Sequence, residues 1–292
     1  APRPGDERGR QTTSPATVPG SGARRTGHGC APPRGDCALP KAAPWQTLCM
    51  ATHFVEPPPS GNQVRKAGEV MRNYVRGDDL VDQSAYLEAL VVIQRHRAAH
   101  QAPLSTANTA LRKMCHRLDI DAQVTQRLKR METIREKLAE RETGLSLDRM
   151  QDIAGCRVVV PTTNEVYLLK DRIVGYHDEA RVTDYIVKPR DSGYRAVHVI
   201  AEYGRAPRKK VEIQIRTQRM HAWADTVERL SGALGVNYKQ DGDHPLQRWA
   251  RLLADIMRLN ELDEPIPDAL NAAYDDALRQ VFPAIEEEER ER

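Results

Sequence analysis

The run from residue 211 to residue 217 constrains the fold of this chain more than any other stretch. Its polar residues Glu212, Gln214 and Arg216 alternate with valine and isoleucine. A period of two residues is typical of a β-strand with one buried face. The run therefore predicts a strand that presents a carboxylate, an amide and a guanidinium on one surface.

Residues 181 to 201 predict two neighbouring strands joined by a turn. The first strand covers residues 181 to 187 and ends before Pro189. Turn-forming residues follow at positions 191 to 193, and after them polar His198 alternates with apolar neighbours. The two strands would extend the polar surface of the later strand with charged and aromatic side chains.

Helical patterns occupy most of the remaining chain. Apolar residues recur three and four positions apart in residues 62 to 116, in residues 164 to 175 and in three segments after Thr217. The same spacing appears in a further stripe: Val124, Leu128, Met131, Ile134 and Leu138. We therefore predict a helix over residues 124 to 138. Its opposite side is basic: Arg127, Arg130, Lys137 and Arg141. A short helix and a buried strand stopped by Pro161 follow it.

The first 58 residues differ in composition from the rest of the chain. More than half of the 19 prolines fall here, among glycine, serine and arginine and with almost no apolar periodicity. Such a segment cannot bury enough apolar surface to offset its ordering entropy, so we expect it to be disordered. Met50 is the first methionine, and one hypothesis is that the natural product starts there.

Net charge and cysteine content argue against several classes of protein. The chain has a formal net charge of +3, and no apolar run approaches the length of a bilayer span, so a membrane role is not expected. So small a charge does not by itself indicate a nucleic-acid binder. The 5 cysteines show no metal-ligand spacing, which predicts reduced thiols in a cytoplasmic protein.

Two carboxylates stand out as candidate metal ligands. Asp152 precedes one predicted strand and Glu212 lies on another, so a mixed sheet could bring them together. Oxygen ligands of this kind suit Mg²⁺. Basic residues accompany them along the sequence: Arg127, Lys137, Arg157, Arg181, Lys188, Arg190 and Arg216. Taken singly, each residue has an ordinary structural explanation, but together they fit a bound polyphosphate that is attacked at phosphorus.

Three motifs give these residues a context: DIAGCR at residues 152–157, a segment from DYI at 184–186 to GYRAVH at 193–198, and EIQIRT at 212–217. In this order the chain resembles the synthetase domain of the RelA/SpoT family, over roughly residues 105 to 240. The resemblance implies an α+β, nucleotidyltransferase-like fold, with a mixed sheet of about five strands flanked by helices and with helical N- and C-terminal additions. We expect the synthetase domain at residues 59–242, after the disordered extension at 1–58 and before amphipathic helices and a charged tail at 243–292.

The resemblance also implies an activity and a set of site residues. The activity is Mg²⁺-dependent transfer of the β,γ-pyrophosphate of ATP to the 3′-hydroxyl of a purine nucleotide, GDP or GTP or else ADP or ATP, which makes alarmones of the (p)ppGpp type. Asp152 and Glu212 would bind Mg²⁺, and Glu212 would also orient or deprotonate the hydroxyl. Four basic residues would handle ATP: Arg127, Lys129, Lys137 and Arg157. Tyr194 would stack on the acceptor base, and three residues would complete the acceptor side: His198, which would also be catalytic, Gln214 and Arg216. Arg181 and Lys188 are the remaining candidate nucleotide-binding residues.

Departures from the family pattern leave alternatives open. Thr183 stands where many members carry a basic residue, which leaves the acceptor undecided. The chain has no room for the hydrolase domain of the long bifunctional members, so it resembles small stand-alone synthetases, including toxic ones that an antitoxin protein neutralises. A second hypothesis sends the pyrophosphate to the 3′ end of tRNA. A third is a catalytically silent regulator that binds nucleotide or RNA, and assembly into a homo-oligomer stays open.

Overall fold

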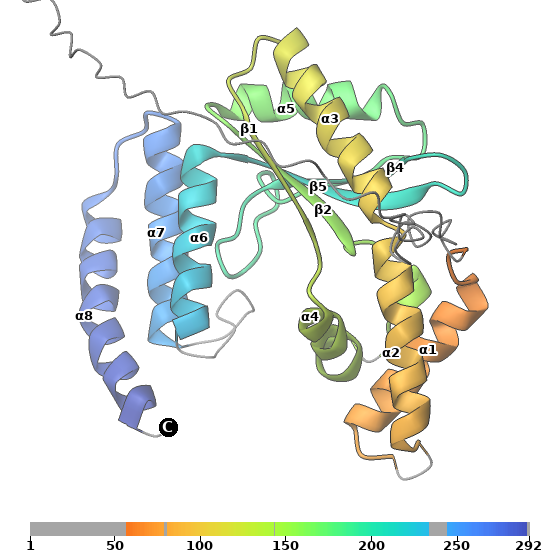
Figure 1. Cartoon of the computed structure of the whole chain (residues 1–292). Helices are drawn as coiled ribbons and strands as arrows, with labels where there is room; N and C mark the ends of the chain where they lie inside the picture. The colour runs from red at the N-terminus through yellow and green to blue at the C-terminus, as the bar shows by residue number, and fades with distance from the viewer. Residues whose placement is uncertain (1–56, 79–80, 143, 234–243, 291–292) are drawn as a thin grey trace, which may run out of the picture. The chain divides into compact units, whose positions relative to one another are not determined.

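Five strands form one mixed sheet at the centre of the computed structural model, which describes residues 57–78, 81–142, 144–233 and 244–290. The strands are β1 (Gln123–Leu128), β2 (Ala154–Val160), β3 (Arg181–Asp184), β4 (Val197–Tyr203) and β5 (Lys209–Thr217). Their order in the sheet is β1-β2-β5-β4-β3 (Figure 1). Strands β2 and β5 pair in parallel, and all the other neighbours are antiparallel. The predicted α+β class and the five-stranded mixed sheet are therefore confirmed.

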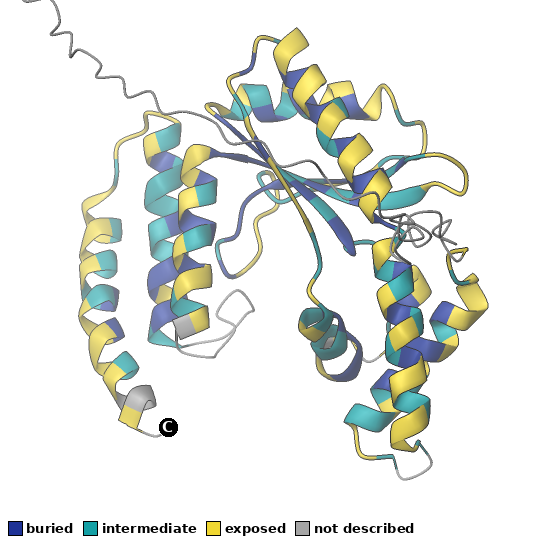
Figure 2. Cartoon of the chain, in the orientation of Figure 1, coloured by how far each residue is buried: buried dark blue, intermediate teal, exposed yellow. Residues whose placement is uncertain are grey.

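The central strand β5 has one apolar and one polar face, as its alternation predicts. Val211, Ile213 and Ile215 are completely buried and pack among the residues of helices α3 (Gln101–Arg117) and α5 (Thr163–Val174). Both helices contact the sheet on this side, and Figure 2 shows the central strands β2 and β5 as mostly buried. The other face of β5 is left to Glu212, Gln214 and Arg216.

Strand register arranges the polar face in two cross-strand rows. The first row runs from β1 to β3 through Arg127, Gly155, Glu212, Ile200 and Arg181. The second row runs in the same direction through Thr125, Arg157, Gln214, His198 and Thr183. Because side chains directly opposite one another in a sheet lie side by side, residues from distant parts of the sequence meet on this surface.

The N-terminal helices form a second core with the segment that leads into β2. Helices α1 (Gly61–Val75) and α2 (Gln83–Ala98) pack against each other, and Ser60 begins α1 with a capping box. Three short helical pieces pack with them: α4 (Met131–Glu136), the π-helix η2 (Lys137–Arg141) and the 3₁₀ helix η3 (Leu147–Arg149). This core therefore contains residues on both sides of Asp152 in the sequence, Met150 and Ile153.

The C-terminal helices form a third core around the turn before β4. Helix α6 (Gln218–Ala233) begins where the Thr217 hydroxyl accepts the backbone N–H of Met220, and α7 (Pro245–Glu261) and α8 (Asp268–Arg290) follow. Gly193 has a φ of +88°, and a Cβ at this position would lie 2.8 Å from the Cβ of Ala254 on α7. Only glycine fits a turn that is left-handed and this closely covered.

The structure describes only part of the regions covered by the predictions about domains and cysteines. The predicted disordered extension falls outside the described residues except for its last two positions, and so does the predicted boundary between residues 242 and 243. Of the cysteines, Cys115 and Cys156 are free and buried, and burial raises the pKa of Cys156 to about 12. Within the described ranges, no helix combines the length and the apolar character that crossing a membrane would require.

The predicted helix over residues 124 to 138 is wrong in its first half. Residues 123 to 128 form β1, with Val124 buried, and only the part from Met131 onward is helical. A spacing of four between Val124 and Leu128 also fits a strand, because both residues then point to the same face. Antiparallel pairing with β2 decides between the two structures.

The predicted strand from residue 181 to residue 187 is too long. Strand β3 ends at Asp184, whose carboxylate accepts the backbone N–H groups of Ile186 at 2.8 Å and of Val187 at 3.0 Å. An aspartate that binds the backbone two residues ahead turns the chain out of the sheet. The alternation of side chains alone does not reveal this turn.

We predict that the buried histidine His96 makes the fold sensitive to acid. Burial, reinforced by His100 and Lys209 and opposed by Asp148, lowers its pKa to about 4. The unfolded chain therefore binds this proton more tightly than the folded chain, so stability is full above about pH 6.5 and falls as the pH drops toward 4. From this residue the loss at pH 5 is roughly 2 kcal/mol.

Urea unfolding at pH 7.5 and pH 5 measures the effect. His96→Leu is expected to lose less stability between the two values than the parent protein does. His116→Leu, at an exposed position of α3, is the matched control and is expected to follow the parent. Equal losses in all three proteins would contradict the assignment.

Candidate active site

Two adjoining cavities open on the polar face of the sheet. The first cavity has a volume of about 290 Å³ and contains both predicted metal ligands, Asp152 and Glu212, in its wall. The second has a volume of about 180 Å³. It is lined by these residues: Arg127, Arg157, Arg190, Tyr194, His198, Gln214, Arg216 and Glu228. Four residues line both: Arg127, Arg157, Gln214 and Glu228. The two cavities are therefore parts of one continuous site.

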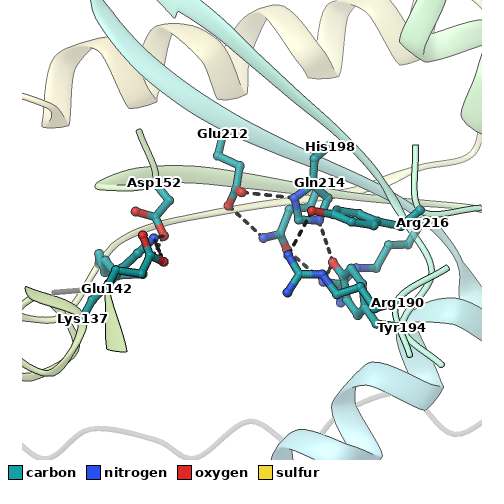
Figure 3. Close-up of polar contacts among 11 residues, drawn as sticks. Lys137, Glu142, Asp152, Arg190, Tyr194, His198, Glu212, Gln214 and Arg216 are labelled. Atoms are coloured by element: carbon teal, nitrogen blue, oxygen red, sulfur yellow. Dashed lines mark hydrogen bonds and ion pairs between the residues drawn. The ribbon is translucent and has the colours of Figure 1, made fainter. Parts of the chain in front are cut away.

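Asp152 is held as an anion by two lysines. Its Oδ2 atom accepts from Lys129 Nζ at 2.8 Å and from Lys137 Nζ at 3.0 Å (Figure 3). Burial alone would raise the pKa of this carboxyl, but attraction and hydrogen bonding from Lys129 and Lys137 outweigh burial and lower it. The second oxygen, Oδ1, is buried and has no hydrogen-bond partner among the described residues.

Glu212 is held by its neighbours on the sheet. Its Oε1 atom lies 3.1 Å from His198 Nδ1, and its Oε2 atom accepts from Gln214 Nε2 at 2.9 Å. Burial and the nearby charge of Asp152 act to raise the pKa of Glu212, but the hydrogen bond and charge of His198 lower it more. The charge of Asp152 therefore acts on Glu212, and both carboxylates line the first cavity.

The polar contacts continue from Glu212 into the second cavity as one chain of hydrogen bonds. His198 Nε2 lies 2.7 Å from the hydroxyl of Tyr194, and this hydroxyl also accepts from Arg216 Nη2 at 2.5 Å. Arg216 donates in addition to Gln214 Oε1 at 2.9 Å. The predicted residues His198, Gln214 and Arg216 are therefore brought together with Glu212, as Figure 3 shows.

The two cavities differ in charge. The second is lined by four arginines and one acidic residue, Glu228. Burial and the nearby charges of Arg216 and Arg127 lower the pKa of Arg157, as expected in a crowded group of cations. The first cavity instead mixes its cations with four carboxylates: Asp152, Glu212, Asp225 and Glu228. The second cavity therefore suits an anion directly, whereas the first suits an anion together with a cation.

Tyr194 shows less of its ring than base stacking would use. Only 7% of the residue is exposed, and the ring packs near Trp223 and Tyr185. The guanidinium of Arg216 lies 4.9 Å from the ring centre and that of Arg190 lies 5.8 Å from it. Its contribution in this structure is the hydroxyl, and stacking of a base on the ring stays a prediction.

The sequence named two residues that the structure does not bring to the site and overlooked others. Arg181 and Lys188 are exposed and line neither cavity, so their predicted roles stay predictions. Conversely, Asp225 of α6 lines the first cavity and was not among the predicted site residues, and Glu228 lines both. With His221 they form a polar stripe at helical spacing, and that stripe is the signal by which they could have been found.

Gly155 leaves the first cavity open, and we predict that a larger side chain closes it. A Cβ at this position would have no neighbour closer than 3.9 Å, so the fold has room for it. Gly155→Val should therefore keep the free energy of unfolding within about 1 kcal/mol of the parent. Because Gly155 lines the first cavity between Arg127 and Glu212, the valine should weaken ATP binding at least about tenfold, or 1.4 kcal/mol.

Isothermal titration with ATP measures the binding, and urea unfolding measures the fold. Gly155→Ala is the matched control, because it adds one carbon atom and should lie between the parent and the valine variant. A folded Gly155→Val protein that binds ATP like the parent would show that the nucleotide does not occupy this cavity.

The chain is similar to several known proteins. Residues 126–243 match the family model described as the region found in RelA/SpoT proteins. The chain is 32% identical over 153 residues to the GTP pyrophosphokinase YjbM of Bacillus subtilis, covering 50% of this chain and 70% of that protein. It is 31% identical over 150 residues to the GTP pyrophosphokinase YwaC of the same organism, covering 47% of this chain and 68% of that protein. The crystal structure of small alarmone synthetase 2 from Bacillus subtilis aligns with a TM-score of 0.49 and 22% identity, over 58% of this chain and 95% of that one.

The matched region contains every motif on which the sequence-based prediction rested. It begins within β1 and includes Asp152, the turn at Gly193 and all of β5. The two relatives named as pyrophosphokinases are each covered over more than two thirds of their length. This chain belongs to the RelA/SpoT family and is a pyrophosphotransferase.

Proposed function

We propose that this protein transfers the β,γ-pyrophosphate of ATP to the 3′-hydroxyl of GDP or GTP. The observation that carries the proposal is that two anionic carboxylates, Asp152 and Glu212, line one cavity that continues into a second cavity with four arginines. The first fits a triphosphate with a cation, and the second fits the phosphates of another nucleotide. The relatives YjbM and YwaC, both named as GTP pyrophosphokinases, support a guanosine nucleotide as acceptor.

Two carboxylates of the first cavity are the residues that would hold a magnesium ion in this proposal. Asp152 Oδ1 is a buried carboxylate oxygen without a partner among the described residues, and Glu212 provides a second carboxylate on the same cavity wall. Hard oxygen donors of this kind match Mg²⁺, which completes its shell with water and phosphate oxygens. In this proposal Asp152 and Glu212 hold the ion, and a bound ion would neutralise part of the charge of the triphosphate.

The basic residues around the first cavity would bind ATP. Lys129 and Lys137 keep Asp152 ionised and lie beside the cavity in which the triphosphate would bind. Arg127 and Arg157 face the same space from β1 and β2. Fixed cations here would stabilise the negative charge that collects on AMP as it leaves.

The acceptor would bind in the second cavity with its 3′-hydroxyl toward Glu212. The oxygen of this hydroxyl attacks the β-phosphorus of ATP, the bond from that phosphorus to the AMP oxygen breaks, and the hydroxyl proton passes to the Glu212 carboxylate. His198 and Gln214 hold the two oxygens of that carboxylate in place. Positioning and charge are what phosphoryl chemistry demands of a protein, so a nucleophilic side chain is not required.

We predict that Asp152→Asn and Glu212→Gln each lower the rate of transfer by about 100-fold or more, because each removes a charge and keeps the shape. The measurement is transfer of label from ATP labelled at the γ-phosphate. The control is Asp171→Asn, the same exchange on α5, on the far face of the sheet, and it should match the parent. Full activity in either site variant would contradict the proposed roles.

The same labelled ATP identifies the acceptor. The protein is incubated separately with GDP, GTP, ADP, unlabelled ATP and deacylated tRNA, and we expect label in GDP or GTP together with release of AMP. Release of ADP would indicate transfer of a single phosphate and would refute pyrophosphate transfer. Label in tRNA or in an adenosine nucleotide would refute the proposed acceptor. Label in none of them, with Asp152→Asn indistinguishable from the parent, would indicate a silent regulator.

A further inference from the structure

Three arginines of the N-terminal helices bind the backbone of the segments that carry Lys129 and Lys137. Arg97 of α2 donates from Nε to the carbonyl oxygen of Lys129 at 2.7 Å. Arg72 of α1 donates from Nε to the carbonyl oxygen of Leu138 at 3.0 Å and from Nη2 to that of Leu145. Arg76, the C-cap residue of α1, donates from Nε and Nη2 to the carbonyl oxygen of Ala139 at 3.1 and 3.0 Å. We call these three residues the arginine clamp.

Two arginines of the clamp bind carbonyl groups of an unusual helical turn. The segment that begins at Lys137 is a π-helix, and its closing bond runs from the N–H of Glu142 to the carbonyl oxygen of Lys137. The next two carbonyl groups, of Leu138 and Ala139, lie in the same turn. Arg72 and Arg76 supply donors to both. A π-helix is uncommon and is often found at a functional site.

The peptide groups on either side of Lys129 are held in a similar way. Its N–H donates to the carbonyl oxygen of Ile153 at 2.8 Å, and its carbonyl oxygen accepts from Arg97. With the backbone fixed on both sides, the side chain of Lys129 reaches Asp152. The position of the ammonium group therefore depends on α2 as well as on β1.

Helix α1 packs closely against η3, the segment that leads to Asp152. A Cβ at Gly68 of α1 would lie 2.8 Å from the Cβ of Leu147, so the helix approaches η3 as near as glycine allows. Leu138 and Leu147 are completely buried in the same core as Val64 and Met71. Asp152 follows five residues after Leu147, and the clamp and this contact therefore act on one continuous stretch of chain.

We propose that Arg72, Arg76 and Arg97 are positioning residues that hold Lys129 and Lys137 at hydrogen-bonding distance from Asp152. In this way they set the affinity of the enzyme for ATP. They do not line either cavity and act through the two lysines. The acceptor side, built on β4 and β5, makes no contact with them among the described hydrogen bonds, so its affinity is independent of the clamp. The proposal rests on the proposed function, because it assumes that ATP binds beside Lys129 and Lys137.

Replacing a clamp arginine by methionine tests the proposal, since methionine keeps much of the length and loses the donors. Arg72→Met and Arg97→Met should each raise the KM for ATP about tenfold, the size of one lost hydrogen bond from a charged group. The KM for the acceptor and kcat at saturating ATP should stay within about twofold of the parent. Arg72→Lys and Arg97→Lys, which keep one donor, should recover part of the loss. Arg65→Met is the matched control: this arginine is on α1 too, and its hydrogen bonds, to Asn62 and Glu69, stay within that helix.

A double-mutant cycle separates positioning from a general loss of structure. If Arg97 acts through Lys129, adding Arg97→Met to Lys129→Met should raise the KM for ATP no further. Equal KM values for Arg72→Met, Arg97→Met and Arg65→Met would overturn the proposal. So would a parallel fall in kcat, both affinities and the melting temperature. If one methionine variant does not fold, the other decides, because the two arginines lie on different helices. Transfer activity in the parent establishes the proposed function separately, so failure of the clamp is distinguishable from failure of that function.

Discussion

The parallel pairing of β2 with β5 is the contact on which the site depends. Parallel strands run in one direction, so the segment that enters β2 lies beside the start of β5. Asp152 comes two residues before β2, and Gly155 lies directly opposite Glu212. The two carboxylates thus line the same cavity although they are far apart in the sequence. The other residues of the site lie around this pair of strands.

The charges of the site are compensated by different means at its two ends. Around Asp152, two ammonium groups converge on a single oxygen, and the other oxygen has no hydrogen-bond partner among the described residues. Around Glu212, a neutral amide and a histidine hold both oxygens. Burying a carboxylate raises the free energy of the folded state unless the carboxylate is hydrogen-bonded. Here residues from other segments provide most of the hydrogen bonds. Each charged group therefore depends on the tertiary fold as well as on its own segment.

Sequence patterns predicted the sheet well where one face is buried. The alternation in β5 identified Glu212, Gln214 and Arg216 as neighbours on one surface, and the glycine turn at Gly193 was placed correctly. They did less well where two structures share a spacing, because Val124 and Leu128 fit either a helix or a strand until the partner strand is known. The polar stripe on α6 could have pointed to Asp225 as a candidate, but its place in the cavity wall depends on how α6 packs against the sheet, which the sequence does not show. The hydrogen bonds of the Tyr194 hydroxyl are likewise tertiary, so the sequence did not indicate them.

The close cover over Gly193 has a consequence for the far end of the chain. Arg195, two residues later, donates to the carbonyl oxygen of Ala254 at 2.6 Å and pairs with Asp255 at 3.0 Å, and the indole N–H of Trp223 donates to the carbonyl oxygen of Ala250. Helix α7 thus covers the turn that positions Tyr194, whose hydroxyl lies beside His198. Helix α7 lines neither cavity, yet it would in this way govern the shape of the second one. A protein shortened before α7 would keep the two carboxylates and lose the shape of the cavity beside them.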